Sequence, residues 1–181
     1  MNEFAHPAPH ALRTERLSLT DLAIADFVST YAMDTDEQVM TYIGGAEARL
    51  FDDYYAFITQ RLSLWIGPKF HIWAMNLHGS ERFLGWVMIK PIRDTPHVEV
   101  GYRMPQSSWG KGYATEATLA VLNYGFNVAG FDDLTAVTHP DNAASQRVLT
   151  KCGLTLDGTL NYSGGGEIPF FRLTKHDYEK L

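Results

Sequence analysis

A glycine-containing turn in the middle of the chain has residue types and a spacing suited to binding a phosphorylated ligand. The turn, Trp-Gly-Lys-Gly-Tyr-Ala at 109–114, follows an apolar, β-branched segment typical of a strand and precedes a segment typical of a helix, 114–126. The first backbone N–H groups of such a helix have no intrahelical partners and lie at the positive end of the helix dipole. Gly110 and Gly112 have no Cβ, so a ligand can approach the backbone closely, and Lys111 adds a positive charge. The turn is therefore a candidate site for phosphate oxygens.

Two common nucleotide-binding fingerprints do not fit this turn. A Walker loop has its lysine after the second glycine, whereas Lys111 lies between the two glycines. A Rossmann loop needs a third glycine where this chain has Thr115. A short Gly-x-Gly turn is most often only a turn. The rest of the chain is therefore needed to distinguish a phosphate-binding turn from a plain one.

Further segments of the chain carry a resemblance to a known family. The turn matches the end of the acyl-coenzyme A pyrophosphate signature Gln/Arg-x-x-Gly-x-Gly/Ala, with Gly112 and Ala114 in the fixed places and Trp109 in the Gln/Arg place. In this form it resembles one branch of the GCN5-related N-acetyltransferase (GNAT) superfamily, which contains the acetyltransferases of ribosomal-protein N-termini. The other segments that resemble the superfamily, in the family's order, are 14–19, 36–40, 141–145 with 151–154, and 173–178.

The resemblance implies a function, a fold and a cofactor site. The function is transfer of an acetyl group from acetyl-CoA to a primary amine, on a peptide N-terminus or a small molecule, directly within a ternary complex. The fold is a single α/β domain with a mixed, mostly antiparallel sheet of about seven strands and helices on both faces. The backbone near Tyr102, Arg103 and Met104 is expected to bulge and to pair with the pantetheine arm. The residues expected to hold the pyrophosphate are Trp109, Gly110, Lys111, Gly112, Tyr113, Ala114 and Thr115.

Acetyl transfer needs a group that takes a proton from the acceptor amine. Glu99 is the candidate because it lies between Val98 and Val100 in a predicted strand, where an ionisable side chain is unusual. Gly101, on the same face, leaves space beside it for a ligand or water. Family members commonly have a general-base glutamate in this strand, acting directly or through water. The alternative is that Glu99 pairs with Arg103 or another charge on a half-solvated strand.

The departing thiolate also needs stabilisation or a proton. Many relatives use a tyrosine of the second cofactor helix, but the corresponding residue here is Leu149, which cannot donate a proton. Ser145 is the available hydroxyl, and Asn142 is placed to bind the pantetheine amide. Both residues also suit a helix N-terminus, and that role does not exclude the first. Cys152 is expected to pack in the core rather than to act as a nucleophile.

Composition excludes several other classes of protein. A chain of 181 residues suits one domain, and a net charge of −6 argues against general nucleic-acid binding. A single cysteine rules out an internal disulfide and favours a reducing cytoplasm. The start of the chain does not resemble a signal peptide, and no apolar window is long enough for a membrane span. The histidines have no metal-ligand spacing, so no metal is expected.

The elements that must position these residues follow from periodicity. Residues 1–12 are predicted to be a flexible lead-in and residues 13–181 the acetyltransferase domain. Three helices besides 114–126 are predicted, including one from Asp21 to Met33 that Asp21 caps, one at 51–66 and one after Asn142. The seven predicted strands are 17–19, 70–75, 83–89, 98–104, 134–138, 154–160 and 169–173. The aromatic residues expected in the core are Tyr54, Tyr55, Trp65, Trp73 and Trp86.

Two other functional classes stay open on the sequence alone. A non-catalytic acyl-CoA binding or sensing domain would keep the cofactor site without turnover, and Leu149 motivates this alternative. A nucleotide-binding module would use the same glycine turn for ATP. The sequence is compatible with a monomer or a homodimer, because exposed sheet edges can pair.

Overall fold

The computed structural model describes residues 11–44, 50–65, 67, 69–162 and 166–181. Within these residues, eight strands form one sheet in the order β1-β2-β3-β4-β5-β6-β8-β7. The strands are Leu12–Arg13, Leu17–Asp21, His71–Leu77, Phe83–Pro91, Val98–Arg103, Asp133–Val137, Thr155–Asn161 and Glu167–Thr174, numbered β1 to β8 along the chain. All neighbours are antiparallel except β5 and β6.

The α/β fold predicted from the sequence is confirmed, with seven strands close to those expected. The eighth strand, β1, begins at Leu12, the last residue of the predicted lead-in; residues 1–10 of that lead-in lie outside the described residues. The helices are Phe27–Asp34, Glu37–Met40, Phe51–Trp65, Tyr113–Asn127, Ala143–Lys151 and Lys175–Tyr178, numbered α1 to α6. None of the described helices is long and apolar enough to cross a bilayer.

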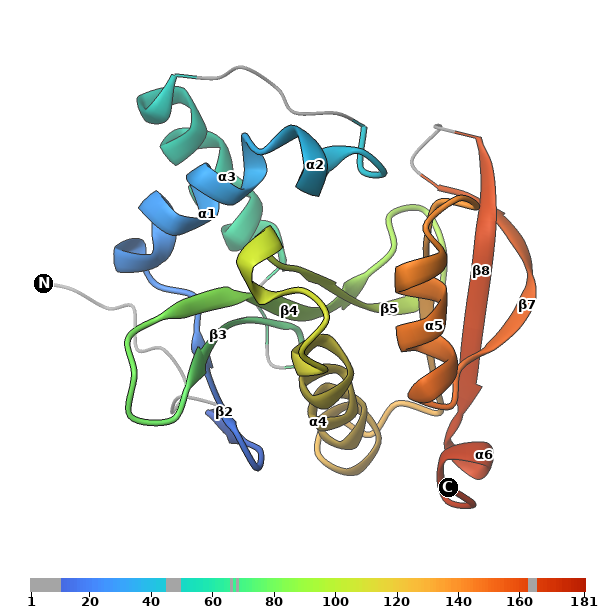
Figure 1. Cartoon of the computed structure of the whole chain (residues 1–181). Helices are drawn as coiled ribbons and strands as arrows, with labels where there is room; N and C mark the ends of the chain where they lie inside the picture. Colours follow the sequence, from blue (N-terminus) through green and yellow to red (C-terminus); the bar gives the residue numbers. More distant parts are fainter. Residues whose placement is uncertain (1–10, 45–49, 66, 68, 163–165) are drawn as a thin grey trace, which may run out of the picture.

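Helices cover both faces of the central strands because those strands are apolar on both faces. Along β4, Val87 and Ile89 belong to the core cluster that contains α4 and α5 residues, whereas Met88 belongs to the cluster under α1 and α3. Figure 1 shows α1, α2 and α3 together on one side of these strands and α4 on the other. The central strands are therefore buried between two helical layers.

Two details of the first helical region differ from the prediction. Asp21 ends β2, where it pairs with Trp73, and does not cap a helix. A 3-10 turn at Ile24–Asp26 follows, and α1 begins only at Phe27. Helical periodicity identified the segment, but it could not show that sheet pairing extends to Asp21.

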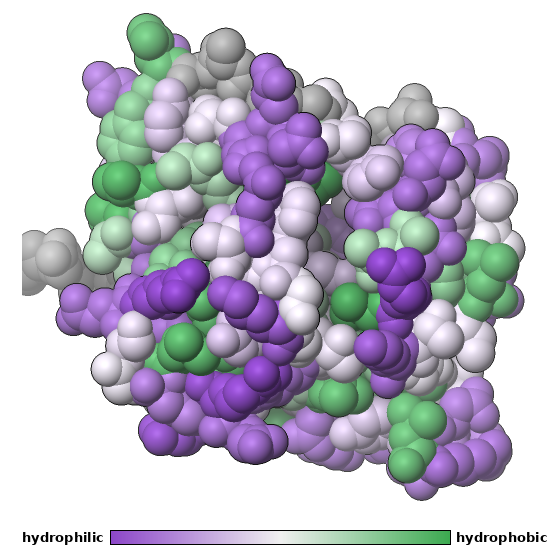
Figure 2. Space-filling view, in the orientation of Figure 1, coloured by the Kyte–Doolittle hydropathy of each residue, from purple (hydrophilic) through white to green (hydrophobic). Residues whose placement is uncertain are grey.

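Several exposed apolar side chains lie on the side of the sheet that α1 and α3 cover. They include Ile24 and Val28, each about two-thirds exposed, and Tyr55, which was expected in the core and is 37% exposed. Figure 2 shows hydrophobic (green) surface gathered on the flank where α1 and α3 lie in Figure 1. Tyr54 and Trp73 are buried and Trp86 is partly buried, as expected; the side chain of Trp65 lies outside the described part of the structure.

Candidate active site

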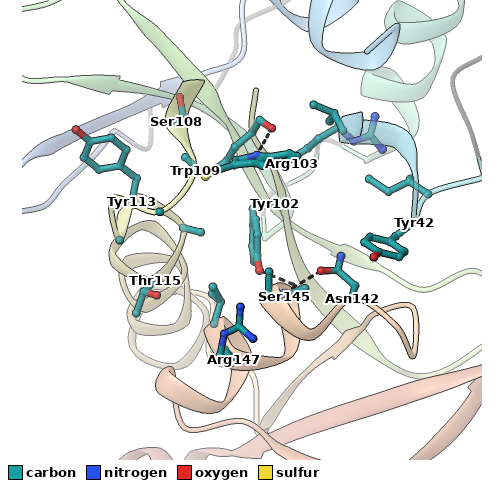
Figure 3. Close-up of a pocket in the computed structure, with 18 of the residues that line it drawn as sticks. Tyr42, Tyr102, Arg103, Ser108, Trp109, Tyr113, Thr115, Asn142, Ser145 and Arg147 are labelled. Atoms are coloured by element: carbon teal, nitrogen blue, oxygen red, sulfur yellow. Dashed lines mark hydrogen bonds between the residues drawn. The ribbon is translucent and has the colours of Figure 1, made fainter. Parts of the chain in front are cut away.

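A cavity of about 560 Å³ lies where β5 ends and α4 begins. The end of β5 contributes Tyr102 and Arg103, the glycine turn and α4 form one wall, and α5 forms the other. The turn after α2 closes a further side with Tyr42. Figure 3 shows Tyr102 between the two helices, with Asn142 and Ser145 beside it. Segments far apart in the sequence thus meet around one elongated space.

The sheet opens beside this cavity. Strand β5 pairs with β6 only through Glu99 and Thr135, so their ladder ends before Tyr102 and Arg103. The antiparallel ladder between β4 and β5 continues to the pair Trp86 and Arg103. The edge of β5 beyond Glu99 is therefore available to an extended ligand, as a free strand edge is to an added strand.

The expected bulge in β5 is wrong, because its ladder with β4 runs without a shift of register. The irregularity is in β4 instead: Met75 pairs with Gly85 and Asn76 with Phe83, which leaves Leu84 as an extra residue. Gly85 has φ +129°, and the carbonyl of Arg103 occupies the place that its Cβ would take. The backbone at the end of β5 is thus set by close packing on a neighbouring glycine.

The start of α4 has backbone donors without partners. Gly112 is the N-cap residue, has φ +79° and provides no capping side chain. The first helical bond runs from the N–H of Glu116 to the carbonyl of Gly112, at 3.1 Å. Among the described residues, nothing accepts a hydrogen bond from the N–H groups of Tyr113, Ala114 and Thr115. An anion in the cavity would replace the missing cap.

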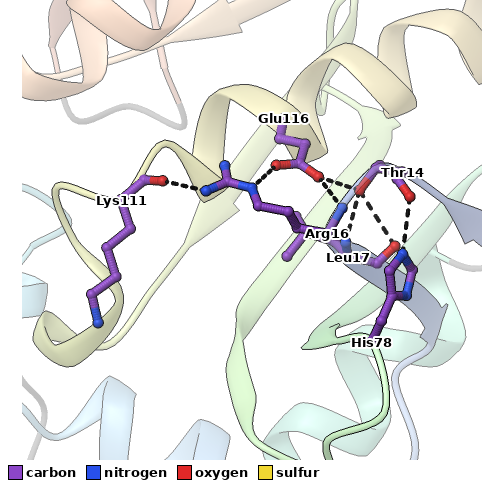
Figure 4. A network of polar contacts seen from close by, with 6 residues as sticks. All are labelled: Thr14, Arg16, Leu17, His78, Lys111 and Glu116. Atoms are coloured by element: carbon purple, nitrogen blue, oxygen red, sulfur yellow. Dashed lines mark hydrogen bonds and ion pairs between the residues drawn. The ribbon is translucent and has the colours of Figure 1, made fainter.

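A polar network lies behind the glycine turn and connects it to the start of the domain (Figure 4). Arg16 donates from Nη1 to the carbonyl of Lys111 at 3.0 Å and from Nε to Glu116 at 2.7 Å. Thr14 also donates to Glu116, at 2.5 Å, and its carbonyl lies 3.0 Å from Nε2 of His78. Burial alone raises the pKa of Glu116, but the hydrogen bonds from Thr14 and Arg16 outweigh it and lower that pKa. Arg16 and Glu116, neither of which lines the cavity, thus hold the turn in place.

All but one of the predicted cofactor residues line the cavity. The exception is Lys111, whose ammonium group binds the carbonyl of Ser107 at 2.7 Å. Trp109 lines the cavity and donates from its indole nitrogen to the carbonyl of Met104, at 2.8 Å. Trp109 therefore joins the end of β5 to the turn, and the backbone of the turn, more than the charge of Lys111, faces the ligand space.

Asn142 and Ser145 lie together at the start of α5. Oδ1 of Asn142 accepts a hydrogen bond from the N–H of Ser145 at 3.0 Å, so Asn142 is the N-cap. Its Nδ2 group remains a donor for another partner. The hydroxyl of Tyr102 donates to Oγ of Ser145 at 3.1 Å (Figure 3). Burial raises the pKa of Tyr102 to about 12, and this outweighs the hydrogen bond to Ser145, so the phenol keeps its proton near neutral pH.

The structure adds cavity residues that the sequence interpretation missed. Arg147 and Lys151 lie four residues apart on α5, and both line the cavity. Neither makes an ion pair with another described residue. Their spacing was readable from the sequence, because residues four apart lie on the same face of a helix. Tyr42, a candidate for the acceptor pocket on the sequence, lines the cavity from a distant segment, and its ring lies 5.2 Å from that of His139.

Glu99 does not line the cavity. It is only 2% exposed, and Oε1 is ion-paired with Lys90 and accepts a hydrogen bond from the hydroxyl of Tyr162 at 2.8 Å. The alternative interpretation is thus right that Glu99 pairs with another charge, Lys90, but wrong about a half-solvated strand, because both side chains are buried. Arg103 pairs instead with Asp34, at 2.6 Å.

The space expected beside Glu99 is also filled. A Cβ on Gly101 would lie 2.7 Å from the terminal methyl group of Met88, so this side chain occupies the volume that glycine leaves. The contacts of Glu99 with Lys90 and Tyr162 are both made by Oε1. Cys152 is fully buried, as expected, and burial raises its pKa to about 12.

Comparison with known proteins agrees with this geometry. Residues 16–155 match the model of the acetyltransferase (GNAT) domain. The uncharacterized protein YkkB of Bacillus subtilis is 32% identical over 152 residues, which cover 82% of this chain and 87% of that protein. The crystal structure of an acetyltransferase from Agrobacterium tumefaciens superposes with a TM-score of 0.79 at 26% identity, covering 96% of this chain and 99% of the other.

A more distant structure has the same fold with ligands bound. Spermidine N-acetyltransferase from Vibrio cholerae, in complex with CoA and spermine, has a TM-score of 0.74 at 15% identity over 90% of this chain and 98% of its own. The family match covers well over half of the present chain, including the turn and both helices of the cavity. The chain therefore belongs to the GNAT acetyltransferase family and is an N-acetyltransferase that uses acetyl-CoA.

Proposed function

We propose that this enzyme transfers the acetyl group directly to a primary amine within a ternary complex. The observation that carries the proposal is the cavity between the uncapped start of α4 and the polar start of α5. The N–H groups of Tyr113, Ala114 and Thr115 supply donors for the diphosphate, and the edge of β5 beyond Glu99 supplies backbone groups for the pantetheine arm. A bound thioester would then reach the sheet opening, with its carbonyl accessible to an amine.

The distribution of charge along α5 supports this orientation of the cofactor. Arg147 and Lys151 lie toward the end of α5, whereas the uncharged Asn142 and Ser145 lie at its start. The anionic part of acetyl-CoA fits the basic end, and the uncharged thioester fits the other. We therefore place the reaction near Ser145.

Glu99 is the proposed base, acting through water. Lys90 and Tyr162 hold one carboxylate oxygen, so the side chain is fixed, and Oε2 is the oxygen that we propose accepts a proton. Water-mediated transfer fits the position of Glu99, which is buried next to the sheet opening and not in the cavity wall. The proton passes from the acceptor ammonium to water and Glu99 before the amine attacks the thioester.

The acceptor is either a peptide N-terminus, as in the ribosomal-protein acetyltransferase branch that the sequence resembles, or a small amine. Spermidine N-acetyltransferase illustrates the second class in the same fold. A panel of polyamines, amino acids and peptides with free N-termini would separate the two classes, with the release of the CoA thiol as the readout. The buried Cys152 gives little background in a thiol assay.

The test of the proposal is Glu99→Gln. We expect turnover to fall by about 10²–10⁴-fold, the usual contribution of a general base, while the Kd for acetyl-CoA stays unchanged. Because the change removes the carboxylate charge that faces the buried Lys90, Lys90→Met/Glu99→Gln, which has neither charge, is the second variant. Full turnover in both variants, or wild-type CoA release that needs no amine, would overturn the proposal.

A further inference from the structure

We propose that Tyr102, acting through Ser145, stabilises the thiolate that leaves when the acetyl group is transferred. This inference rests on the proposed function and assigns a positioning role that the cavity geometry supports. Both residues line the cavity, and they come from different elements, β5 and α5. Their hydroxyl oxygens are 3.1 Å apart.

Ser145 is held at two points. Its backbone N–H is bound by Oδ1 of Asn142, and its Oγ accepts the hydrogen bond from Tyr102. A serine hydroxyl has one proton to donate. Because Tyr102 acts as the donor in their contact, the Ser145 proton is not used in that bond. Among the described residues nothing else accepts it, so it is available to a group in the cavity.

The reaction creates a group that needs this proton donor. When the amine nitrogen attacks the carbonyl carbon, the C–S bond breaks and its electron pair stays on sulfur. The Ser145 hydroxyl donates a hydrogen bond to this thiolate, and the bond from Tyr102 strengthens it, as linked hydrogen bonds polarise one another. Neither hydroxyl is ionised. The second proton of the nitrogen, lost after the attack, passes to solvent water because Glu99 already holds the ammonium proton, and the thiolate, with a pKa near 8.5, takes a proton from solvent.

Leu149, at the place of the tyrosine used by many relatives, is apolar and 2% exposed, so it provides no hydrogen-bond donor. The high pKa of Tyr102 fits a residue that donates a hydrogen bond and does not give up its proton. A purely structural role, joining β5 to α5, would affect stability without a specific effect on the chemical step.

The test uses Tyr102→Phe, Ser145→Ala and the double variant. We expect kcat to fall about tenfold in Tyr102→Phe and further in Ser145→Ala, with KM and Kd for acetyl-CoA nearly unchanged. Because Tyr102 acts through Ser145, the double variant should be no slower than Ser145→Ala. The matched control is Tyr178→Phe, which loses a phenolic hydrogen bond of 3.2 Å to Asn123 on α4, away from the cavity.

The outcomes separate this inference from the proposed function. If the wild type releases CoA with an amine and Tyr102→Phe keeps its kcat within twofold, the inference is wrong. The same holds if the effects of the two single variants multiply in the double variant. If the wild type transfers acetyl to no amine at all, the proposed function fails first.

Discussion

Nε of Arg16 lies 2.7 Å from Oε2 of Glu116, which joins the residues just before β2 to the first turn of α4. The same guanidinium binds the carbonyl of Lys111 inside the glycine turn. Two segments about 100 residues apart are thus connected at the point where the cofactor diphosphate is expected. The ion pair is partly exposed, so its importance lies in positioning the turn more than in global stability.

Replacing Arg16 should therefore weaken cofactor binding. Arg16→Gln removes both contacts that hold the turn, and we expect the KM for acetyl-CoA to rise about five- to tenfold with a smaller change in kcat. Steady-state kinetics with varied acetyl-CoA checks this. Arg13→Gln is the control, because Arg13 is exposed and forms no ion pair with other described residues. Equal KM values for Arg16→Gln and Arg13→Gln would contradict the positioning role.

Glu116 should make stability depend on acidic pH. Its pKa is lowered in the folded state, so it stabilises the protein above its unfolded pKa, and this contribution is lost as the pH falls through the folded value. The difference in free energy of unfolding between wild type and Glu116→Gln should therefore be largest near pH 7 and shrink below about pH 4.5. Urea unfolding at several pH values measures it. A difference that is independent of pH would show that the carboxylate charge is not involved.

Gly112 is required for its backbone conformation and for its place in the cavity. Gly112→Ala puts a side chain at φ +79°, at a cost of roughly 1–2 kcal/mol, and brings a Cβ within 3.4 Å of Arg16. We expect lower stability together with weaker acetyl-CoA binding, measured by denaturation and calorimetry. Gly158→Ala, at φ +98° in β7 with open space around it, should lose stability alone. Unchanged cofactor affinity in Gly112→Ala would contradict a diphosphate at this position.

Arg147 should contribute to the binding of the phosphates of acetyl-CoA and not to the binding of its thioester end. Arg147→Gln is expected to weaken acetyl-CoA binding about tenfold, while binding of S-acetylpantetheine, which has the thioester but no diphosphate, stays the same. Arg93→Gln, at an exposed arginine of the β4–β5 loop, is the control. Equal losses for both ligands would show that Arg147 does not face the phosphates.

Local patterns were sufficient to predict most of the fold. Alternation and helical periodicity gave seven of the strands and the positions of α3, α4 and α5. The glycine turn and Ser145 were also readable, because a helix start imposes its own requirements on residue type. The predictions that failed concern pairing between segments. Strand β1 is only two residues long, and Asp21 belongs to the sheet because it pairs with a residue of β3.

The environment of Glu99 could not be predicted for the same reason. The strand pattern identified an unusual acidic residue, but its partners, Lys90 on β4 and Tyr162 after β7, are set by strand register and by a hairpin from the other end of the chain. Likewise, the contact of Tyr102 with Ser145 requires β5 and α5 to pack around one cavity. Sequence periodicity gives the face on which a residue lies, whereas the partner opposite it depends on the tertiary structure.

The central claim is that the first N–H groups of α4 bind the diphosphate of acetyl-CoA. The most direct measurement is a ¹⁵N–¹H correlation spectrum of the protein saturated with acetyl-CoA and, separately, with S-acetylpantetheine. We predict that the amide resonances of Tyr113, Ala114 and Thr115 shift strongly with acetyl-CoA and hardly with S-acetylpantetheine. Amide resonances of these three residues that stay in place in the acetyl-CoA complex would contradict the claim.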